Sequence, residues 1–74
     1  MNMVQHFTAR YTSIPSGYMG QLLEWPEVIT EGATLDECRE MLKDALKQMI
    51  AAHHQLNKPI PEASSLFEHI PVEV

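Results

Sequence analysis

The side chains of this 74-residue chain that could carry out chemistry are those of four histidines, one cysteine and ten acidic residues. His53 and His54 are neighbours in a predicted helix, so their side chains point about 100° apart, whereas two ligands of one metal on a helix need i, i+4 spacing. Cys38 is the single cysteine and is expected to be a small core residue. The sequence therefore predicts neither a metal site nor a cofactor.

The residue types of hydrolytic enzymes are also present, without the patterns that bring them together. Ser64, His69 and Asp44 are the types found in a catalytic triad, but no motif places them near one another. Glu40 and Asp44 are expected on the solvated face of a helix and not in an acid–base pair. The three glycines are scattered and form no phosphate-binding loop. We therefore predict that the protein has no catalytic residues and is not an enzyme.

The charge balance is acidic, with a formal net charge of −5 from ten acidic and five basic residues. This balance argues against nucleic-acid binding through a broad basic surface. It suits a basic protein partner, or it serves only to keep the domain in solution. The first residues lack the pattern of a signal peptide, and no segment approaches a membrane span. A single cysteine fits a reducing, cytoplasmic location.

One long amphipathic helix is predicted over residues 35–56. Thr34 and Glu37 form a capping-box pattern at its start, and Asn57 suits the left-handed position after its end, with Pro59 two residues beyond. The side chains expected on one face of this helix are those of Leu35, Cys38, Leu42, Ala45, Leu46, Met49, Ile50, His53 and Leu56.

The rest of the chain must supply the surface on which this helix packs. Alternation predicts a strand at residues 4–12, a turn at 14–17 and a second strand at 17–23, where Gly20 suggests either a bulge or close packing above it. A third strand is expected at residues 28–31 and a fourth, at a sheet edge, at 66–74. The prediction is a single α+β domain, β-β-β-α-β, with the helix on one sheet face.

A domain of this size buries little surface, so the core must be small and assembly is expected to add stability. We expect a dimer or tetramer built partly from strand edges. The residues predicted to form the core are Phe7, Ala9, Leu35, Cys38, Leu42, Leu46 and Met49.

Several short motifs, in order, resemble the HicB-like antitoxins. They are the Gly-Tyr pair at 17–18, the loop proline at 26, the Thr-Glu-Gly-Ala-Thr run at 30–34 followed by Leu-Asp-Glu, and Pro-Ile-Pro at 59–61. The resemblance implies a truncated ribonuclease H-like fold. It also implies binding to a small basic mRNA-cleaving toxin, HicA. The first predicted strand carries no acidic residue, which argues against ribonuclease activity. We expect no added DNA-binding domain in residues 1–74, and therefore no direct nucleic-acid binding.

Two functions follow from these patterns. The first is an antitoxin that masks a HicA-like toxin through Glu24, Glu27 and Glu31, with Trp25 as an aromatic anchor. Trp25 could equally pack over the end of the sheet. The second is a stand-alone homo-oligomeric scaffold or small-ligand-binding protein that has no toxin partner.

Overall fold

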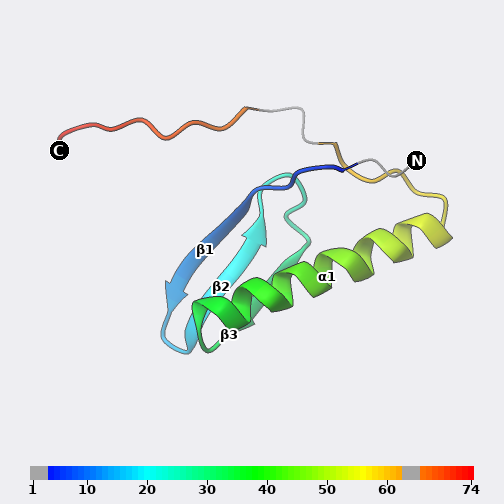
Figure 1. The fold of residues 1–74 in the computed structure, drawn as a ribbon, viewed down its shortest axis with the longest axis horizontal. Coiled ribbons are helices and arrows are strands. Elements are labelled where there is room, and N and C mark those ends of the chain that lie inside the picture. The colour runs from blue at the N-terminus through cyan, green and yellow to red at the C-terminus, as the bar shows by residue number, and fades with distance from the viewer. Residues whose placement is uncertain (1–3, 63–65) are drawn as a thin grey trace.

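Three antiparallel strands and one long helix form the fold of residues 4–62 and 66–74, the residues that this computed structural model describes (Figure 1). The strands are β1 (Ala9–Ile14), β2 (Gly17–Leu22) and β3 (Ile29–Gly32), in the sheet order β1-β2-β3. The helix α1 (Leu35–Gln55) lies across one face of this sheet. The predicted α+β class, with one helix packed on one sheet face, is confirmed.

Local signals in the sequence set both ends of α1. The Thr34 hydroxyl accepts a hydrogen bond from the Glu37 backbone N–H at 3.1 Å, which is one half of the predicted capping box. At the other end Asn57 has φ 54°, and the Lys58 N–H donates to the His53 carbonyl at 2.9 Å. This is the left-handed Schellman ending in which the chain reverses and satisfies the last helical carbonyls.

The first two strands form a hairpin whose two-residue turn is Pro15-Ser16, as the turn signals predicted. The first strand begins at Ala9, later than the predicted start at residue 4, and continues to Ile14. Residues 4–8 are outside the sheet because β2 ends at Leu22, and the Thr8 N–H donates to the Glu24 carboxylate and not to a strand carbonyl.

The core lies between the sheet and α1 and consists of Leu22, Trp25, Val28, Cys38 and Leu42. Two of the seven predicted core residues, Cys38 and Leu42, are buried. Phe7, Leu46 and Met49 are half-buried and pack against the core, and Leu35 is half-buried at the start of the helix. Ala9 is exposed, so its assignment to the core is wrong: it lies on an edge strand, where the space between β1 and α1 is open to solvent.

Two glycines let the helix approach the sheet closely at Cys38. A Cβ atom at Gly20 would lie 3.1 Å from the Cys38 sulfur, and one at Gly32 would lie 2.5 Å from the Cys38 backbone nitrogen. Gly20 keeps regular pairing with Tyr11 and Thr30, so the close-packing alternative is confirmed and there is no bulge at this residue. The Cys38 side chain is fully buried as a result.

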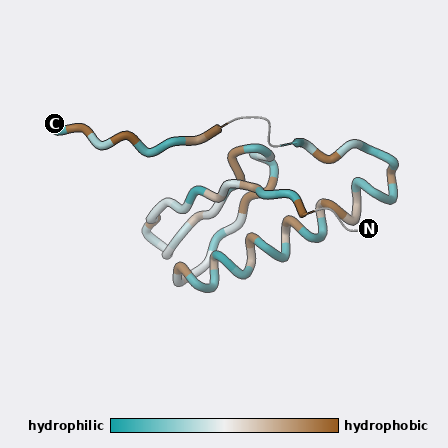
Figure 2. Tube along the Cα trace, turned by 45° about the horizontal axis from the view of Figure 1, so that its top comes forward, coloured by the Kyte–Doolittle hydropathy of each residue, from teal (hydrophilic) through white to brown (hydrophobic). Residues whose placement is uncertain are grey.

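The predicted fourth strand at residues 66–74 is wrong for the single chain. This segment has no regular secondary structure and extends away from the sheet (Figure 1). Figure 2 shows hydrophobic and hydrophilic residues alternating along it. Its apolar side chains are exposed, including Ile70 and Val72, each at 75%. Within the described residues, α1 is not apolar enough over a sufficient length to cross a membrane.

Leu42→Ala should lower the free energy of unfolding by about 2–5 kcal/mol, because it removes a buried side chain from the centre of a small core. Chemical denaturation measures this loss, with exposed Lys47→Ala on the same helix as the control. A loss below about 1 kcal/mol would mean that Leu42 contributes little to the core.

Gly32→Ala should destabilise the fold by about 1–3 kcal/mol, because its methyl group would collide with the backbone of Cys38. Thermal unfolding followed by circular dichroism measures the change. The control is Ala33→Ser at the exposed neighbouring position. Equal melting temperatures for Gly32→Ala and the unchanged protein would contradict the close approach of α1 to β3.

Candidate interaction surface

The loop between β2 and β3 carries three of the four predicted partner-contact residues, and the structure places them in different environments. Trp25 is only 3% exposed. Its ring packs edge-on against His53, with ring centroids 4.8 Å apart, and lies 6.4 Å from the ring of Phe7. Packing over the end of the sheet therefore describes Trp25 in this structure, and a buried indole is not available as an exposed anchor.

Glu24 is half-buried and holds the segment that leads into β1. One carboxylate oxygen accepts the Thr8 backbone N–H and the other accepts the Thr8 hydroxyl, each at 2.6 Å. Burial raises the pKa of Glu24, but these hydrogen bonds outweigh it and keep the pKa below its ordinary value of 4.5. Glu24 thus links residues 4–8 to the loop that contains Trp25.

Glu27 and Glu31 are exposed, as a partner contact requires. A shallow depression between β3 and α1 has two adjoining parts that share Ala45 and Gln48. Glu27 and Ile29 line one part, of about 320 Å³, and Glu40 and Met41 line the other, of about 340 Å³. Two exposed apolar side chains, Ile29 at 47% and Met41 at 46%, lie at this place. We call this edge of the molecule, where β3 lies beside α1, the β3–α1 surface. Its exposed residues include Glu27, Ile29, Glu40, Met41 and Asp44, which line the depression, and Glu31, which lies on β3 outside it.

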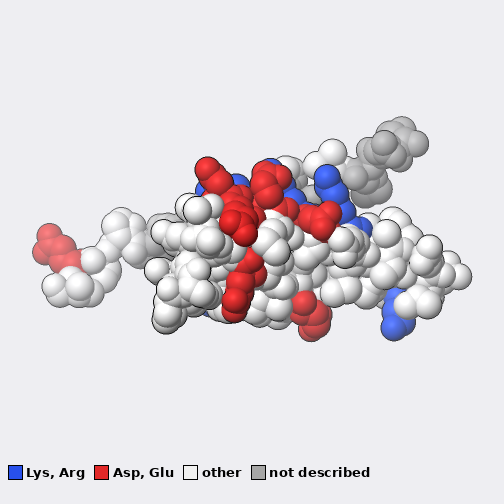
Figure 3. Space-filling view, turned by 90° about the horizontal axis from the view of Figure 1, so that it is seen from below, with Lys and Arg blue, Asp and Glu red and all other residues white. Residues whose placement is uncertain are grey.

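The β3–α1 surface is acidic. Of its four carboxylates, Glu40 lies 3.5 Å from the Lys43 ammonium, and Asp44 accepts a hydrogen bond from Gln48 at 2.9 Å. Such an exposed i, i+3 ion pair neutralises little. Figure 3 shows acidic side chains gathered over the middle of the face that α1 occupies. Glu40 and Asp44 of α1, which the sequence pattern placed on a plain solvated face, therefore line the same two-part depression as Glu27.

One polar atom beside the β3–α1 surface lacks a partner. The Thr30 hydroxyl is buried and makes no hydrogen bond among the described residues. Thr30 also lines the depression between β3 and α1. A buried hydroxyl without a hydrogen bond costs about 1–3 kcal/mol, so a bound group that bonds to it would gain that contribution.

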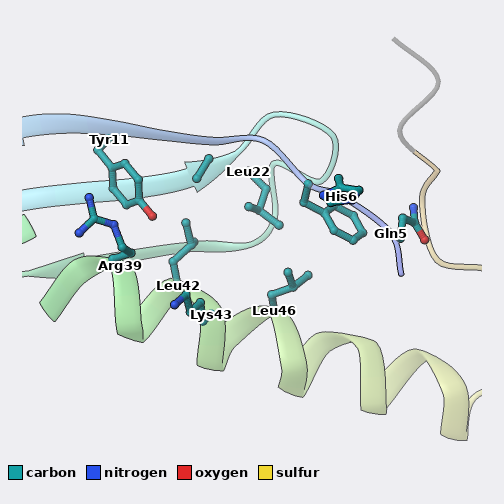
Figure 4. A pocket seen from close by; sticks show the side chains of 10 residues that line it. Gln5, His6, Tyr11, Leu22, Arg39, Leu42, Lys43 and Leu46 are labelled. Carbon is teal, nitrogen blue, oxygen red and sulfur yellow. The ribbon is translucent and has the colours of Figure 1, made fainter. Parts of the chain in front are cut away.

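A second depression, which we call the β1 groove, lies at the opposite edge of the sheet, between β1 and α1 (Figure 4). Its volume is about 270 Å³. The groove does not follow from the sequence pattern, although the alternation of Phe7, Ala9 and Tyr11 predicts one of its walls. The groove is lined by Phe7, Ala9, Tyr11, Arg39, Leu42 and Lys43, among others.

The described residues hold no group of three or more His, Cys, Asp and Glu side chains that could bind a metal ion. The arrangement of the exposed groups is suited to contacts with another macromolecule. Acids surround a shallow apolar centre on one side, and an apolar groove lies at the edge of the sheet on the other.

Glu24→Gln should remove a pH-dependent part of the stability, because the folded state lowers the pKa of this carboxyl group. That contribution is full above pH 4.5 and is lost as the pH falls through the lower folded-state pKa. At neutral pH we expect a loss of about 1 kcal/mol in the free energy of unfolding, since Glu24 is partly exposed. The difference in free energy of unfolding between Glu24→Gln and the unchanged protein should become smaller below pH 4.5.

Chemical denaturation at a series of pH values provides this measurement. Glu27→Gln, in the same loop but exposed, is the control and should change the free energy of unfolding by less than about 0.5 kcal/mol at neutral pH. A constant difference between Glu24→Gln and the unchanged protein from neutral pH to pH 3 would show that the Glu24 charge does not stabilise the fold.

Comparison with known proteins gives one match. The sequence pattern of a family described as UPF0150-like matches residues 7–61, which include all three strands and the helix. No curated protein and no solved structure matches the chain. The matched segment covers more than half of the 74 residues. The chain belongs to the UPF0150-like family.

Proposed function

We propose that this protein is an antitoxin that binds a small basic RNA-cleaving toxin and masks the toxin's RNA-binding surface. The observation that carries the proposal is the β3–α1 surface, where exposed Glu27 lies with Ile29 and exposed Glu40 and Asp44 lie with Met41. The resemblance of the sequence motifs to HicB-like antitoxins supports the same assignment, as does membership of a family of this antitoxin type.

The mechanism follows from charge and position. An enzyme that cleaves RNA needs basic side chains to hold phosphates. Glu27, Glu31, Glu40 and Asp44 present carboxylates to the same cations, while Ile29 and Met41 supply apolar area at the centre of the contact. The antitoxin therefore competes with RNA for the toxin and covers its active site. Trp25 and Glu24 act indirectly, because they hold the loop that carries Glu27.

This proposal assigns no catalytic residue and no cofactor to the chain, and no direct contact with nucleic acid. It places the protein in the cytoplasm, where an mRNA-cleaving toxin acts. The growth test below decides between this proposal and the alternative of a stand-alone homo-oligomer.

In the growth test, the small basic protein encoded beside this chain is expressed alone and together with it. We expect growth arrest and mRNA cleavage with the neighbour alone, and restored growth and intact mRNA when both are expressed. A neighbour that is harmless alone, or that stays toxic in the presence of this protein, would contradict the antitoxin assignment and favour the stand-alone alternative.

The proposed surface is tested by Glu27→Lys combined with Glu31→Lys. Reversing both charges should weaken toxin binding by about tenfold or more and reduce its dependence on salt. Calorimetric titration at several salt concentrations measures both effects. The control, Glu62→Lys with Glu73→Lys, makes the same change in net charge at exposed positions away from this surface. Equal affinities for the two double variants would show that the toxin binds elsewhere.

A further inference from the structure

The β1 groove and residues 66–74, which we call the tail, have complementary properties within one chain. The groove is apolar at its floor, where Leu22, Leu42 and Leu46 meet (Figure 4). The tail leaves its apolar side chains largely exposed in the single chain, with Ile70 and Val72 each 75% exposed. Both features are unfavourable in water as they stand.

The backbone of β1 is open to a further strand. The Thr8 carbonyl accepts the Leu23 N–H at 2.9 Å, and in an antiparallel pair such bonded positions alternate. Alternate residues from Thr8 onwards therefore direct their backbone groups to β2. Ala9, Tyr11 and Ser13 direct theirs to the outer edge, where the described part of the chain supplies no strand. Ala9 and Tyr11 also line the groove, so one added strand could pair with this edge and fill the groove together.

The residue order of the tail suits that position. Ile70, Val72 and Val74 alternate, so their side chains share one face and their N–H groups point to one side of an extended strand. With these N–H groups directed at β1, Pro71, which has no N–H to donate, faces solvent. Proline is tolerated at such a place on an edge strand and protects the new edge from further pairing.

Charge is complementary as well. The groove is bordered by Arg39 and Lys43, and Glu68 lies on the same side of the tail as Ile70 and Val72. The Lys43 ammonium forms only a long ion pair, 3.5 Å from a Glu40 carboxylate oxygen, and the Lys43 side chain is 63% exposed. A tail that filled the groove could therefore bring the Glu68 carboxylate near the Lys43 ammonium.

We infer that the tail of one chain pairs with β1 of a second copy and fills its β1 groove, and that the second copy does the same in return. The single chain supports exchange over self-docking, since its fold is complete while its own tail extends away from the sheet and the groove is open (Figure 1). The product is a closed dimer with two four-stranded sheets. This inference does not depend on the proposed antitoxin function.

The first test compares the intact chain with a chain that stops after Glu62, by size-exclusion chromatography with light scattering at about 10 μM. The intact chain should be a dimer and the shortened chain a monomer with an unchanged circular dichroism spectrum, since the core lies within residues 7–60. A monomeric intact chain, or a dimer that survives the truncation, would overturn the inference.

Point variants test the register of the tail. Val72→Asp should weaken the dimer by about tenfold or more, because it places a charge in the apolar groove. His69→Asp adds the same charge on the other side of the tail and should change the dimerisation constant by less than about threefold. Equal effects of the two substitutions would contradict the proposed orientation.

The final experiment separates exchange from self-docking. Equal amounts of unlabelled and ¹⁵N-labelled intact chain are unfolded, refolded together and treated with a carbodiimide, which joins an amine directly to a carboxylate. Exchange predicts Lys43–Glu68 cross-links, about half of which join an unlabelled peptide to a labelled one. Glu68→Gln should abolish them. Cross-links found only between peptides of the same isotope would show that each tail docks on its own chain, and their absence would place the tail elsewhere.

Discussion

The closest approach between α1 and the sheet is at Cys38, and the rest of the structure depends on this contact. Gly20 and Gly32 leave space for it, because a Cβ at either position would meet Cys38 atoms. The helix therefore crosses the sheet with its first turns almost against β2 and β3. A larger residue at either glycine would lift α1 and open the small core formed by Leu22, Trp25, Val28, Cys38 and Leu42.

A helix docked in this way closes one face of a three-stranded sheet and leaves both edges uncovered. Further along α1 from Cys38, Trp25 fills the space between the sheet and the last turns of the helix, where its ring packs against His53. The Glu24–Thr8 hydrogen bonds hold the segment before β1 against this end of the molecule. The two depressions lie between α1 and the two outer strands of the sheet, one beside β1 and one beside β3.

These two depressions differ in charge, and the difference separates their uses. The β3–α1 surface carries four carboxylates, which suits a basic partner. The β1 groove is bordered by Arg39 and Lys43 and has an apolar floor, which suits the acidic and apolar tail of a second chain. Self-assembly and partner binding can therefore take place together on opposite sides of one small domain.

Features determined by neighbouring residues were predictable from the sequence. The Thr34 cap, the reversal at Asn57 and the Pro15-Ser16 turn depend on local hydrogen bonds and backbone preferences, and each lies where the pattern placed it. The close packing at Gly20 was one of two stated alternatives. The exposure of Glu27 and Glu31 also followed from their types and positions.

Features that depend on docking between distant segments were not predictable. The burial of Trp25 requires α1 to bring His53 against the loop, 28 residues further along the chain. The bonds between Thr8 and Glu24 likewise join separate segments and shorten β1 at its start. The tail has the alternation of a strand, yet the single chain leaves it unpaired, because alternation specifies a strand without specifying which chain supplies its neighbour.

Backbone amide hydrogen exchange, measured by nuclear magnetic resonance with and without the toxin, tests most directly whether the two edges of the sheet have separate uses. The account predicts slow exchange at Ala9, Tyr11 and Ser13 already in the protein alone, because a second copy pairs with β1. The Leu22 N–H donates to the Val28 carbonyl, and bonded pairs alternate, so Thr30 and Gly32 are bonded to β2 while Ile29 and Glu31 face the open edge of β3. Slowing at Ile29 and Glu31 should appear only when the toxin is added. Fast exchange at the β1 positions without toxin, or toxin-dependent protection of β1 in place of β3, would contradict it.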